Sequence, residues 1–179
     1  MKPLFTIHEG EFLVGDYINR EFGNKYDVWV PTKDSGVDLL VTRRARKSAG
    51  VGLQVKFSRS FPIREEFSRH VIATSWYTLK PQKIRESLAY LWVFVILTLR
   101  HEEHFVVVPT SELRKRIPRG GGIWNLYLWV CSDGSCYQVR DLNNDERLDT
   151  VHRGVRNRRL DFSNWLGCWK LLEESTRGR

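Results

Sequence analysis

Two apolar runs of strand length carry polar residues at positions that restrict the fold more than any other feature of the chain. They are residues 36–41 (GVDLLV) and 51–57 (VGLQVKF). Successive side chains of a strand point to opposite faces, so Gln54 and Lys56 share one face. An amide and an ammonium among apolar residues are costly to bury without partners. Asp38, brought there by the preceding strand, would be such a partner, and so would a divalent cation.

Charge and composition indicate the class of protein and its partner. The chain has 179 residues, of which 41% are hydrophobic and 28% charged, values typical of a globular protein with one core. We therefore expect a single domain over residues 1–179. The net charge of +8 favours a polyanionic partner, nucleic acid before membrane, although basic charge can also serve solubility alone.

Targeting signals and cysteines bear on the compartment. Residues 1–10 contain charges and a proline, unlike a signal peptide. The longest apolar stretch, residues 88–99, is shorter than the roughly 20 residues that span a bilayer. Three cysteines without a Cys-x-x-Cys pair argue for a reducing compartment and against structural zinc. We expect a cytoplasmic protein without a membrane partner.

The first third of the chain has the clearest periodicity. Residues 8–23 have apolar side chains at helical spacing and end in a glycine, which predicts an amphipathic helix. Glu11 lies near its start, where a solvated glutamate is favoured by the helix dipole even without a catalytic role. Residues 26–30, 37–42 and 51–57 predict three strands in an antiparallel meander.

The rest of the chain predicts further helices and strands with loops between them. Helices are expected over 64–74, 81–89, 111–117 and 165–172, strands over 90–99, 105–108, 123–131 and 136–140, and a polar loop over 143–149. Asp133-Gly134 predicts a two-residue hairpin that places Cys131 opposite Cys136. His101 and His104 fall in another hairpin turn and lack the helical spacing of a zinc site, so a metal role is disfavoured there.

The polar residues of the two central strands have the chemistry of phosphodiester hydrolysis. This reaction uses a metal ion that polarises the phosphate and lowers the pKa of the attacking water. Mg²⁺ prefers oxygen ligands and keeps several waters. Asp38 can supply a carboxylate oxygen, Gln54 an amide oxygen and Val55 its backbone carbonyl. Lys56 can orient or deprotonate the attacking water and offset charge in the transition state.

These residues resemble the PD-(D/E)xK nuclease superfamily, in particular the Gln-x-Lys variant of Mrr-type restriction endonucleases, and also archaeal Holliday-junction resolvases and related prokaryotic domains. The resemblance covers residues 8–110. It implies a restriction-endonuclease-like α/β fold, with a mixed central β-sheet flanked by helices. It also implies catalytic roles for Glu11 on the first helix, Asp38 on the second strand, and Gln54 and Lys56 on the third. The implied metal ligands are the three side chains at 11, 38 and 54 together with Val55.

The chain departs from the family pattern at two positions. Val37 occupies the place of the proline, and Gln54 replaces a carboxylate. The neutral amide removes one negative charge and weakens metal affinity, so Glu11 becomes more important. Glu9 is the competing helix residue, because the choice depends on the phase of the helix.

Basic residues flank the two motif-bearing strands. They are candidates for phosphate contacts, which position a duplex without reading its sequence. The candidate DNA-binding residues are Arg43, Arg44, Arg46, Lys47, Arg59 and Arg64. Any one of them can equally be a solvated charge, and the sequence contains no recognition helix or zinc module that would read base edges.

The sequence thus predicts a Mg²⁺-dependent endonuclease that hydrolyses DNA, with Mn²⁺ able to substitute. The alternatives are a DNA-binding module, or a partner-binding module, on the same fold with weak or lost activity. A homodimer would suit cleavage of both strands. A partner protein of a defence or repair system is the other possible assembly.

Overall fold

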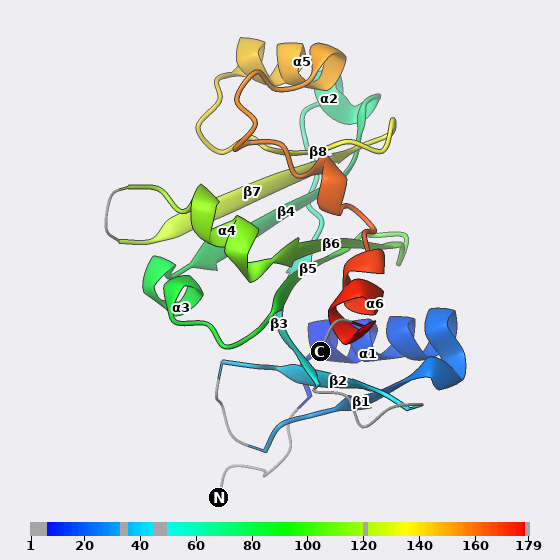
Figure 1. Cartoon of the computed structure of the whole chain (residues 1–179). Coiled ribbons are helices and arrows are strands. Elements are labelled where there is room, and N and C mark those ends of the chain that lie inside the picture. The colour runs from blue at the N-terminus through cyan, green and yellow to red at the C-terminus, as the bar shows by residue number, and fades with distance from the viewer. Residues whose placement is uncertain (1–6, 33–35, 45–49, 120–121, 178–179) are drawn as a thin grey trace, which may run out of the picture.

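The computed structural model describes residues 7–32, 36–44, 50–119 and 122–177. In these residues the chain forms eight strands and six α-helices (Figure 1). The strands divide into a five-stranded sheet, ordered β1-β2-β3-β5-β6, and a three-stranded sheet, ordered β4-β7-β8. The predicted α/β class, with a mixed sheet flanked by helices, is confirmed, and the second sheet is an addition to it.

The first helix agrees closely with its prediction. α1 (Glu9–Phe22) is followed by Gly23, whose φ of 51° lies in the left-handed region that glycine adopts without strain. Val14 and Ile18 are fully buried against the five-stranded sheet. Phe12 is 58% exposed, so the buried stripe of α1 is narrower than its apolar residues suggest.

The five-stranded sheet begins with the predicted meander. Its strands are β1 (Tyr26–Trp29), β2 (Leu39–Arg43), β3 (Val51–Arg59), β5 (Leu91–Leu97) and β6 (Glu103–Pro109). β1, β2 and β3 pair antiparallel, β5 pairs parallel with β3, and β6 returns antiparallel to β5, so the sheet is mixed. The turn between β5 and β6 passes through His101, whose φ is 61°. The hairpin predicted at this position is confirmed, but His104, expected in the turn, lies in β6 opposite Ile96.

The three-stranded sheet was not predicted in full. Its strands are β4 (Val71–Leu79), β7 (Trp124–Cys131) and β8 (Cys136–Gln138). The helix predicted over 64–74 is wrong beyond α2 (Glu65–Ser68), since β4 begins at Val71. The polar residue Thr74 interrupts the apolar pattern of this strand, so the sequence did not predict it. The hydrogen-bond partners of Thr74 come from a distant segment. Its hydroxyl donates to the Phe61 carbonyl at 2.8 Å and accepts from the Phe61 backbone N–H at 3.0 Å.

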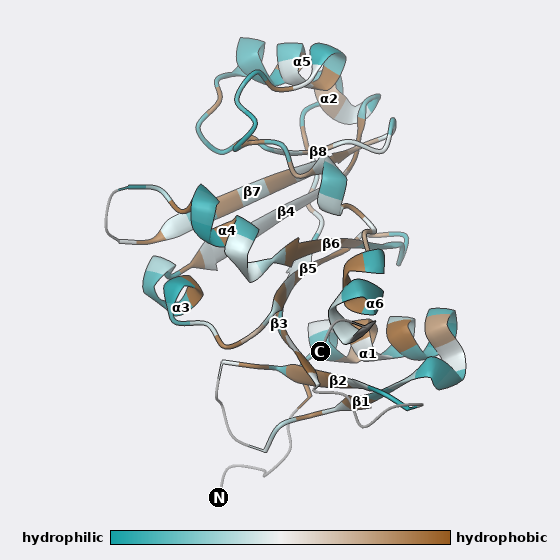
Figure 2. Ribbon diagram, viewed as in Figure 1, coloured by the Kyte–Doolittle hydropathy of each residue, from teal (hydrophilic) through white to brown (hydrophobic). Residues whose placement is uncertain are grey.

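β5 is a strand of the five-stranded sheet and lies at the centre of the core. Alternate residues of β5 point to opposite sides, and its first six residues are buried. Figure 2 shows the hydrophobic colouring of this strand. Trp92, Phe94 and Ile96 pack against the three-stranded sheet, whereas Leu91, Val93 and Val95 pack on the side of α1 and the end of the chain. The predicted strand buried on both faces is therefore confirmed.

The hairpin between β7 and β8 has a different register from the one predicted. Val130 pairs with Cys136, and Cys131 donates its N–H to the Ser135 carbonyl at 2.8 Å. The loop is longer than two residues because Gly134, with φ of 85°, adds a residue in the left-handed region. Cys131 and Cys136 consequently lie in different core clusters, and both are free thiols. The prediction that they face each other is wrong.

The shorter helices cover the edges of the sheets. α3 (Pro81–Arg85) is shorter than predicted, and α4 (Thr110–Arg116) confirms the short basic helix. α5 (Asn144–Arg153) replaces the predicted polar loop, and the hydrogen bonds exchanged by Asn143 and Glu146 cap its first turn.

The last helix begins later than predicted. A 3₁₀ turn (Ser163–Trp165) precedes α6 (Lys170–Arg177), because Gly167 with φ of 60° interrupts the run that the apolar pattern suggested. Trp169 is 4% exposed and packs on the side of α1, as expected for a docked terminal segment. No helix within the described ranges has the length and apolar character needed to cross a membrane.

Candidate active site

Asp38 lies just beyond the point where β2 stops pairing with β3. The last paired residues are Leu39 and Leu53, both fully buried. The backbone N–H of Asp38 donates to the Leu53 carbonyl at 2.8 Å, which holds the residue against β3. The apolar pairing therefore places the half-buried carboxylate beside the middle of β3.

One carboxylate oxygen of Asp38 accepts hydrogen bonds from two donors of β3. Oδ2 accepts the backbone N–H of Val55 at 2.7 Å, and it also accepts the side-chain amide Nε2 of Gln54. Both donors are neutral. The dipoles of these two donors stabilise the negative charge of the carboxylate.

Lys56 lies on the same face of β3 as Gln54. Its Nζ is 5.6 Å from the centroid of the Trp92 ring, within range of a cation–π interaction. Val55 and Phe57 point to the other face, toward α1. The predicted division of β3 into two faces is confirmed, and we call Asp38, Gln54, Val55 and Lys56 the Asp38 site.

The backbone of Val55 also faces Asp38. The N–H and C=O of one residue point to the same side of a strand, and the N–H of Val55 meets Asp38. Its carbonyl is therefore directed to the side of β3 where β2 has stopped pairing. This direction is compatible with the ligand role predicted for the Val55 carbonyl.

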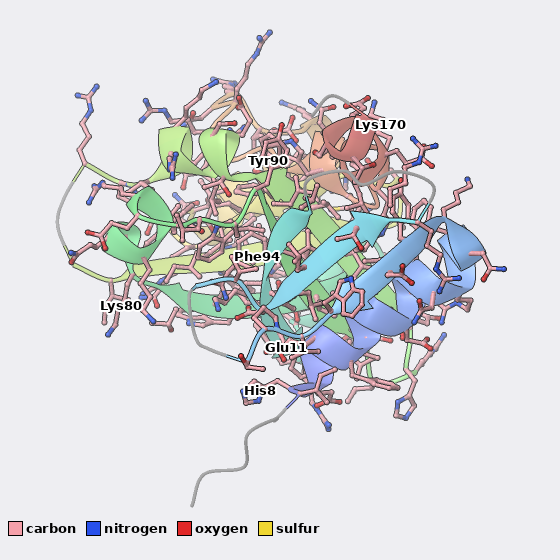
Figure 3. The ribbon with its side chains drawn as sticks, turned by 60° about the horizontal axis from the view of Figure 1, so that its bottom comes forward. His8, Glu11, Lys80, Tyr90, Phe94 and Lys170 are labelled. Atoms are coloured by element: carbon pink, nitrogen blue, oxygen red, sulfur yellow. The ribbon has the colours of Figure 1, made fainter. Side chains whose placement is uncertain are left out.

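The phase of α1 distinguishes the two candidate glutamates. Glu11 is 9% exposed, whereas the Glu9 side chain is 43% exposed and forms an ion pair with Arg59 at 3.1 Å. Figure 3 shows His8 and Glu11 at the beginning of α1. One oxygen of Glu11 accepts the backbone N–H of His8 at 3.1 Å. Glu11 is therefore buried rather than solvated.

A close contact brings the start of α1 onto β3. A Cβ at Gly10 would lie 2.7 Å from the Cβ of Phe57 and 3.3 Å from Cγ1 of Val55. Only glycine permits this approach without a shift of the helix or the strand. Glu11, the next residue of α1, is consequently held beside the strand that carries Gln54 and Lys56.

The oxygen donors of this region suit a hard divalent cation. Among the described residues, no three side chains of His, Cys, Asp or Glu gather into a metal-binding group. The candidate set depends instead on the Asp38 carboxylate, the Gln54 amide oxygen and the Val55 carbonyl, with Glu11 nearby. Mg²⁺ is commonly held by one or two carboxylates and several waters, so the chemistry of this donor set fits it.

Two of the predicted phosphate-binding cations, Arg43 and Arg44, lie at the end of β2. Arg43 ends β2, and Arg44 follows it with an ion pair to Asp27 at 2.6 Å. Arg43 is about 16 Å along the strand from Asp38, and Arg44 is one residue further. Arg46 and Lys47 fall outside the described residues.

The other two predicted cations follow the strand that carries Lys56. Arg59 ends β3 and forms its exposed ion pair with Glu9, while Arg64 lies 3.8 Å from Glu66. The side chains of Arg59 and Arg64 are 72% and 69% exposed. Exposed pairs of this kind contribute only about 0–1 kcal/mol, so phosphate groups can compete for these arginines.

Two aromatic residues near the site were not singled out from the sequence. Trp92 lies under Lys56, and the backbone N–H of Trp76 donates to the Ser58 hydroxyl at 3.1 Å. The parallel pairing of Lys56 with Phe94 sets Trp92 two residues away on β5. That pairing joins distant segments, so no local pattern indicates the contact.

The chain was compared with protein families and curated proteins. No protein-family model matches it, and no curated protein matches it at a significant level.

Proposed function

We propose that this protein is a metal-dependent nuclease that hydrolyses DNA phosphodiester bonds. The observation that carries the proposal is the contact of Asp38 with Gln54 and with the Val55 backbone, with Lys56 next on the face of Gln54. The order of a Glu-bearing helix, an Asp at the second strand and Gln-x-Lys on the third resembles the PD-(D/E)xK superfamily.

Each residue of the site has a distinct role in this proposal. Asp38, Gln54 and the Val55 carbonyl, together with Glu11, would hold Mg²⁺ or Mn²⁺. The bound ion would polarise the phosphate and lower the pKa of the attacking water. The Lys56 ammonium orients that water and stabilises negative charge that develops on the phosphate oxygens. Trp92 supports the Lys56 side chain through its ring face.

The basic surface supports DNA as the substrate. The chain carries a net charge of +8, and Arg59 ends the strand of Lys56, with Arg64 five residues further along the chain. Their ion pairs with exposed glutamates can be exchanged for phosphate contacts at little cost. Arg43 and Arg44 would extend this contact at the end of β2, and Arg46 and Lys47 of the segment that follows would add to its charge.

One observation favours the alternative of a binding module with weak or lost activity. The Gln54 amide donates to Asp38, so the carboxylate already has hydrogen-bond partners without a cation. A carboxylate at position 54 would instead repel Asp38 and favour a metal ion between them. On this alternative the protein binds DNA or a partner protein through the same surface.

The proposed setting is the cytoplasm, in a defence or repair system. Three free cysteines are compatible with a reducing compartment. A homodimer with paired sites would account for cleavage of both strands. Light scattering of the purified protein measures the oligomeric state, and a mass equal to one chain, with and without DNA, would contradict the dimer.

Metal-dependent cleavage tests the nuclease function. Purified protein is incubated with supercoiled plasmid and with branched DNA in Mg²⁺, Mn²⁺ or EDTA. We expect cleavage with either metal, and its loss in Asp38→Ala and Lys56→Ala. Asp16→Ala and Lys83→Ala are matched controls, since both change exposed residues outside the site. Salt-sensitive DNA binding without cleavage in either metal would favour the binding module, and no DNA binding at low salt would favour a partner-binding protein.

A further inference from the structure

A cluster of aromatic and arginine side chains lies on the outer face of the three-stranded sheet. We call it the Trp76 surface, and it consists of Phe61, Trp76, Tyr127, Arg140 and Arg147. The ring centroid of Tyr127 lies 5.5 Å from that of Phe61 and 5.6 Å from that of Trp76. Trp76 is 40% exposed and Phe61 36% exposed, so large aromatic faces remain open to solvent.

The alternation of β4 explains why these rings lie outside the core. Tyr77 points inward, where its hydroxyl donates to the Val95 carbonyl of β5 at 2.8 Å. Trp76, the preceding residue, therefore points away from the five-stranded sheet. α2 and α5 cover part of this outer face through Phe67 and Val151, but they leave Trp76 exposed.

The positive charges of the Trp76 surface are held by ring faces rather than by carboxylates. The Arg140 guanidinium carbon lies 4.9 Å from the centroid of Trp76, and that of Arg147 lies 5.9 Å from the centroid of Tyr127. Neither arginine forms an ion pair within the described ranges. Arg147 is half-buried and its Nε donates to the Val139 carbonyl at 3.3 Å, whereas Arg140 is exposed. The charge of Arg140 therefore remains available to an anionic partner, and a partner with flat rings suits the exposed aromatic faces.

The Trp76 surface is joined to the strand of the Asp38 site. Ser58 accepts the Trp76 N–H at 3.1 Å, and Ser60 accepts the Thr74 N–H at 3.0 Å. These two hydrogen bonds link the edge of β4 to the end of β3. Ser58 follows Lys56 by two residues on the same face, a distance of about 7 Å along the strand. A polymer bound at Lys56 can thus continue onto β4.

We propose that the Trp76 surface binds unpaired bases of single-stranded DNA, with Trp76 as the stacking platform and Arg140 on an adjacent phosphate. Single-stranded DNA offers both free base faces and phosphate charge, whereas in a duplex the base faces are already stacked on one another. The proposal rests on the proposed function and narrows its substrate to DNA with a single-stranded segment beside the cleaved bond.

Binding without cleavage tests this proposal separately from the nuclease. Fluorescence anisotropy is measured in EDTA and low salt with a labelled oligothymidylate about 12 nucleotides long, and with a duplex of the same length. We expect Trp76→Ala to weaken single-strand binding about tenfold and duplex binding by less than about twofold. Trp76→Phe should recover most of the affinity, because it restores an aromatic face.

Two matched controls separate stacking and charge from general surface effects. Phe12→Ala removes another exposed aromatic residue, on α1, and should leave both affinities unchanged. Arg140→Gln should reduce the salt dependence of single-strand binding by about one ion. Arg100→Gln, at the exposed turn between β5 and β6, should not.

The outcomes distinguish the two proposals. If Trp76→Ala keeps full affinity for the single strand, or loses equal affinity for single strand and duplex, the proposal that Trp76 stacks on bases is refuted. The Trp76 surface would then be assigned to a protein partner. Absence of oligonucleotide binding by the wild type at low salt also refutes the proposal. Trp76-dependent binding by a protein that never cleaves DNA supports the surface and refutes the nuclease. Cleavage that is unaffected by Trp76→Ala on single-stranded, branched and duplex DNA supports the nuclease and refutes the surface.

Discussion

Among the described residues, the Asp38 carboxylate and the arginines of the Trp76 surface carry opposite charges and have different kinds of partner. At the Asp38 site a carboxylate accepts hydrogen bonds from a neutral amide and a neutral backbone N–H. At the Trp76 surface two guanidinium groups lie over aromatic rings without a carboxylate partner. One region therefore suits a cation, and the other suits an anion.

The two regions also differ in how firmly they are held. Asp38 is fixed beside fully buried leucines at the end of a strand pair, whereas Trp76 stands on the open face of a small sheet. A half-buried carboxylate within a rigid frame is suited to fix an ion in one geometry. Exposed aromatic rings are suited to a ligand recognised by its flat faces rather than by sequence.

The largest expected difference between the regions is their dependence on metal. Removal of divalent cations with EDTA should lower the cleavage rate at least about 10³-fold, because the ion provides several kcal/mol of transition-state stabilisation. Binding of single-stranded DNA to the Trp76 surface should change by less than about twofold. Gel assays of cleavage and anisotropy of binding measure both effects on one preparation. Cleavage that continues in EDTA would contradict the role given to Asp38.

The contact of α1 with β3 should matter more to the Asp38 site than to the Trp76 surface. Gly10→Ala places a methyl group against Phe57 and Val55, and we expect it to lower the free energy of unfolding by about 1–3 kcal/mol. The matched change Gly15→Ala meets only Cγ1 of Val28 at 3.9 Å, so it should be neutral or stabilising by up to about 1 kcal/mol. Urea denaturation measures both. Equal stability of the two variants would refute the tight crossing.

A second carboxylate at the Asp38 site should increase its preference for cations. In Gln54→Glu the Mg²⁺ concentration for half-maximal cleavage should fall about tenfold, since the added charge strengthens ion binding. Without metal the variant should melt at a lower temperature than the wild type, because two carboxylates then repel each other. Gln82→Glu creates a similar pair with Glu86 on the exposed surface of α3, where the change in stability should stay within about 0.5 kcal/mol. Melting curves with and without Mg²⁺ that are alike for both variants would count against a metal at Asp38.

Independence of the two regions can be measured with double-mutant cycles. Trp76→Ala and Arg140→Gln should be coupled by about 0.5–1 kcal/mol in single-strand binding, because their side chains are in contact. Asp38→Ala and Trp76→Ala should be additive in EDTA. Strong coupling between Asp38 and Trp76 would show that the Asp38 site and the Trp76 surface act as one site rather than as two independent regions.

The smallest expected effect is a loss of folding stability at acidic pH, which would affect both regions because it concerns the whole fold. Burial lowers the pKa of His104 on β6 below its usual value, and its Nε2 has no hydrogen-bond partner among the described residues. A lowered pKa means that the unfolded chain takes up the proton first as the pH falls, so stability is lost below the usual range of histidine. His104→Gln should reduce this loss in urea denaturation across acidic pH. His101→Asn, a control at the exposed turn that keeps a residue tolerant of positive φ, should not. An unchanged pH profile in His104→Gln would refute the assignment.

Periodic segments were predictable because their pattern is local. Val14 and Ile18 at helical spacing predicted the buried face of α1, and the nearly continuous apolar run around Val93 predicted a strand buried on both sides. The division of β3 between Gln54 and Lys56 on one face and Val55 on the other follows from strand geometry alone.

Segments stabilised by distant partners were not predictable. Thr74 lies in a strand because Ser60 and Phe61 satisfy its polar groups, and neither residue is near it in sequence. The β7–β8 register depends on whether Gly134 adds a residue to the loop, which Asp133-Gly134 alone does not decide.

The sequence by itself determined the order of Asp38, Gln54 and Lys56 along the chain and the shared face of the last two. Only the tertiary structure decided that the Asp38 carboxylate meets the Gln54 amide, and that Trp76 is fastened to the same strand through Ser58. The physical reason is that side-chain alternation is a property of each strand alone, whereas register and sheet contacts depend on the burial of residues far apart in the chain.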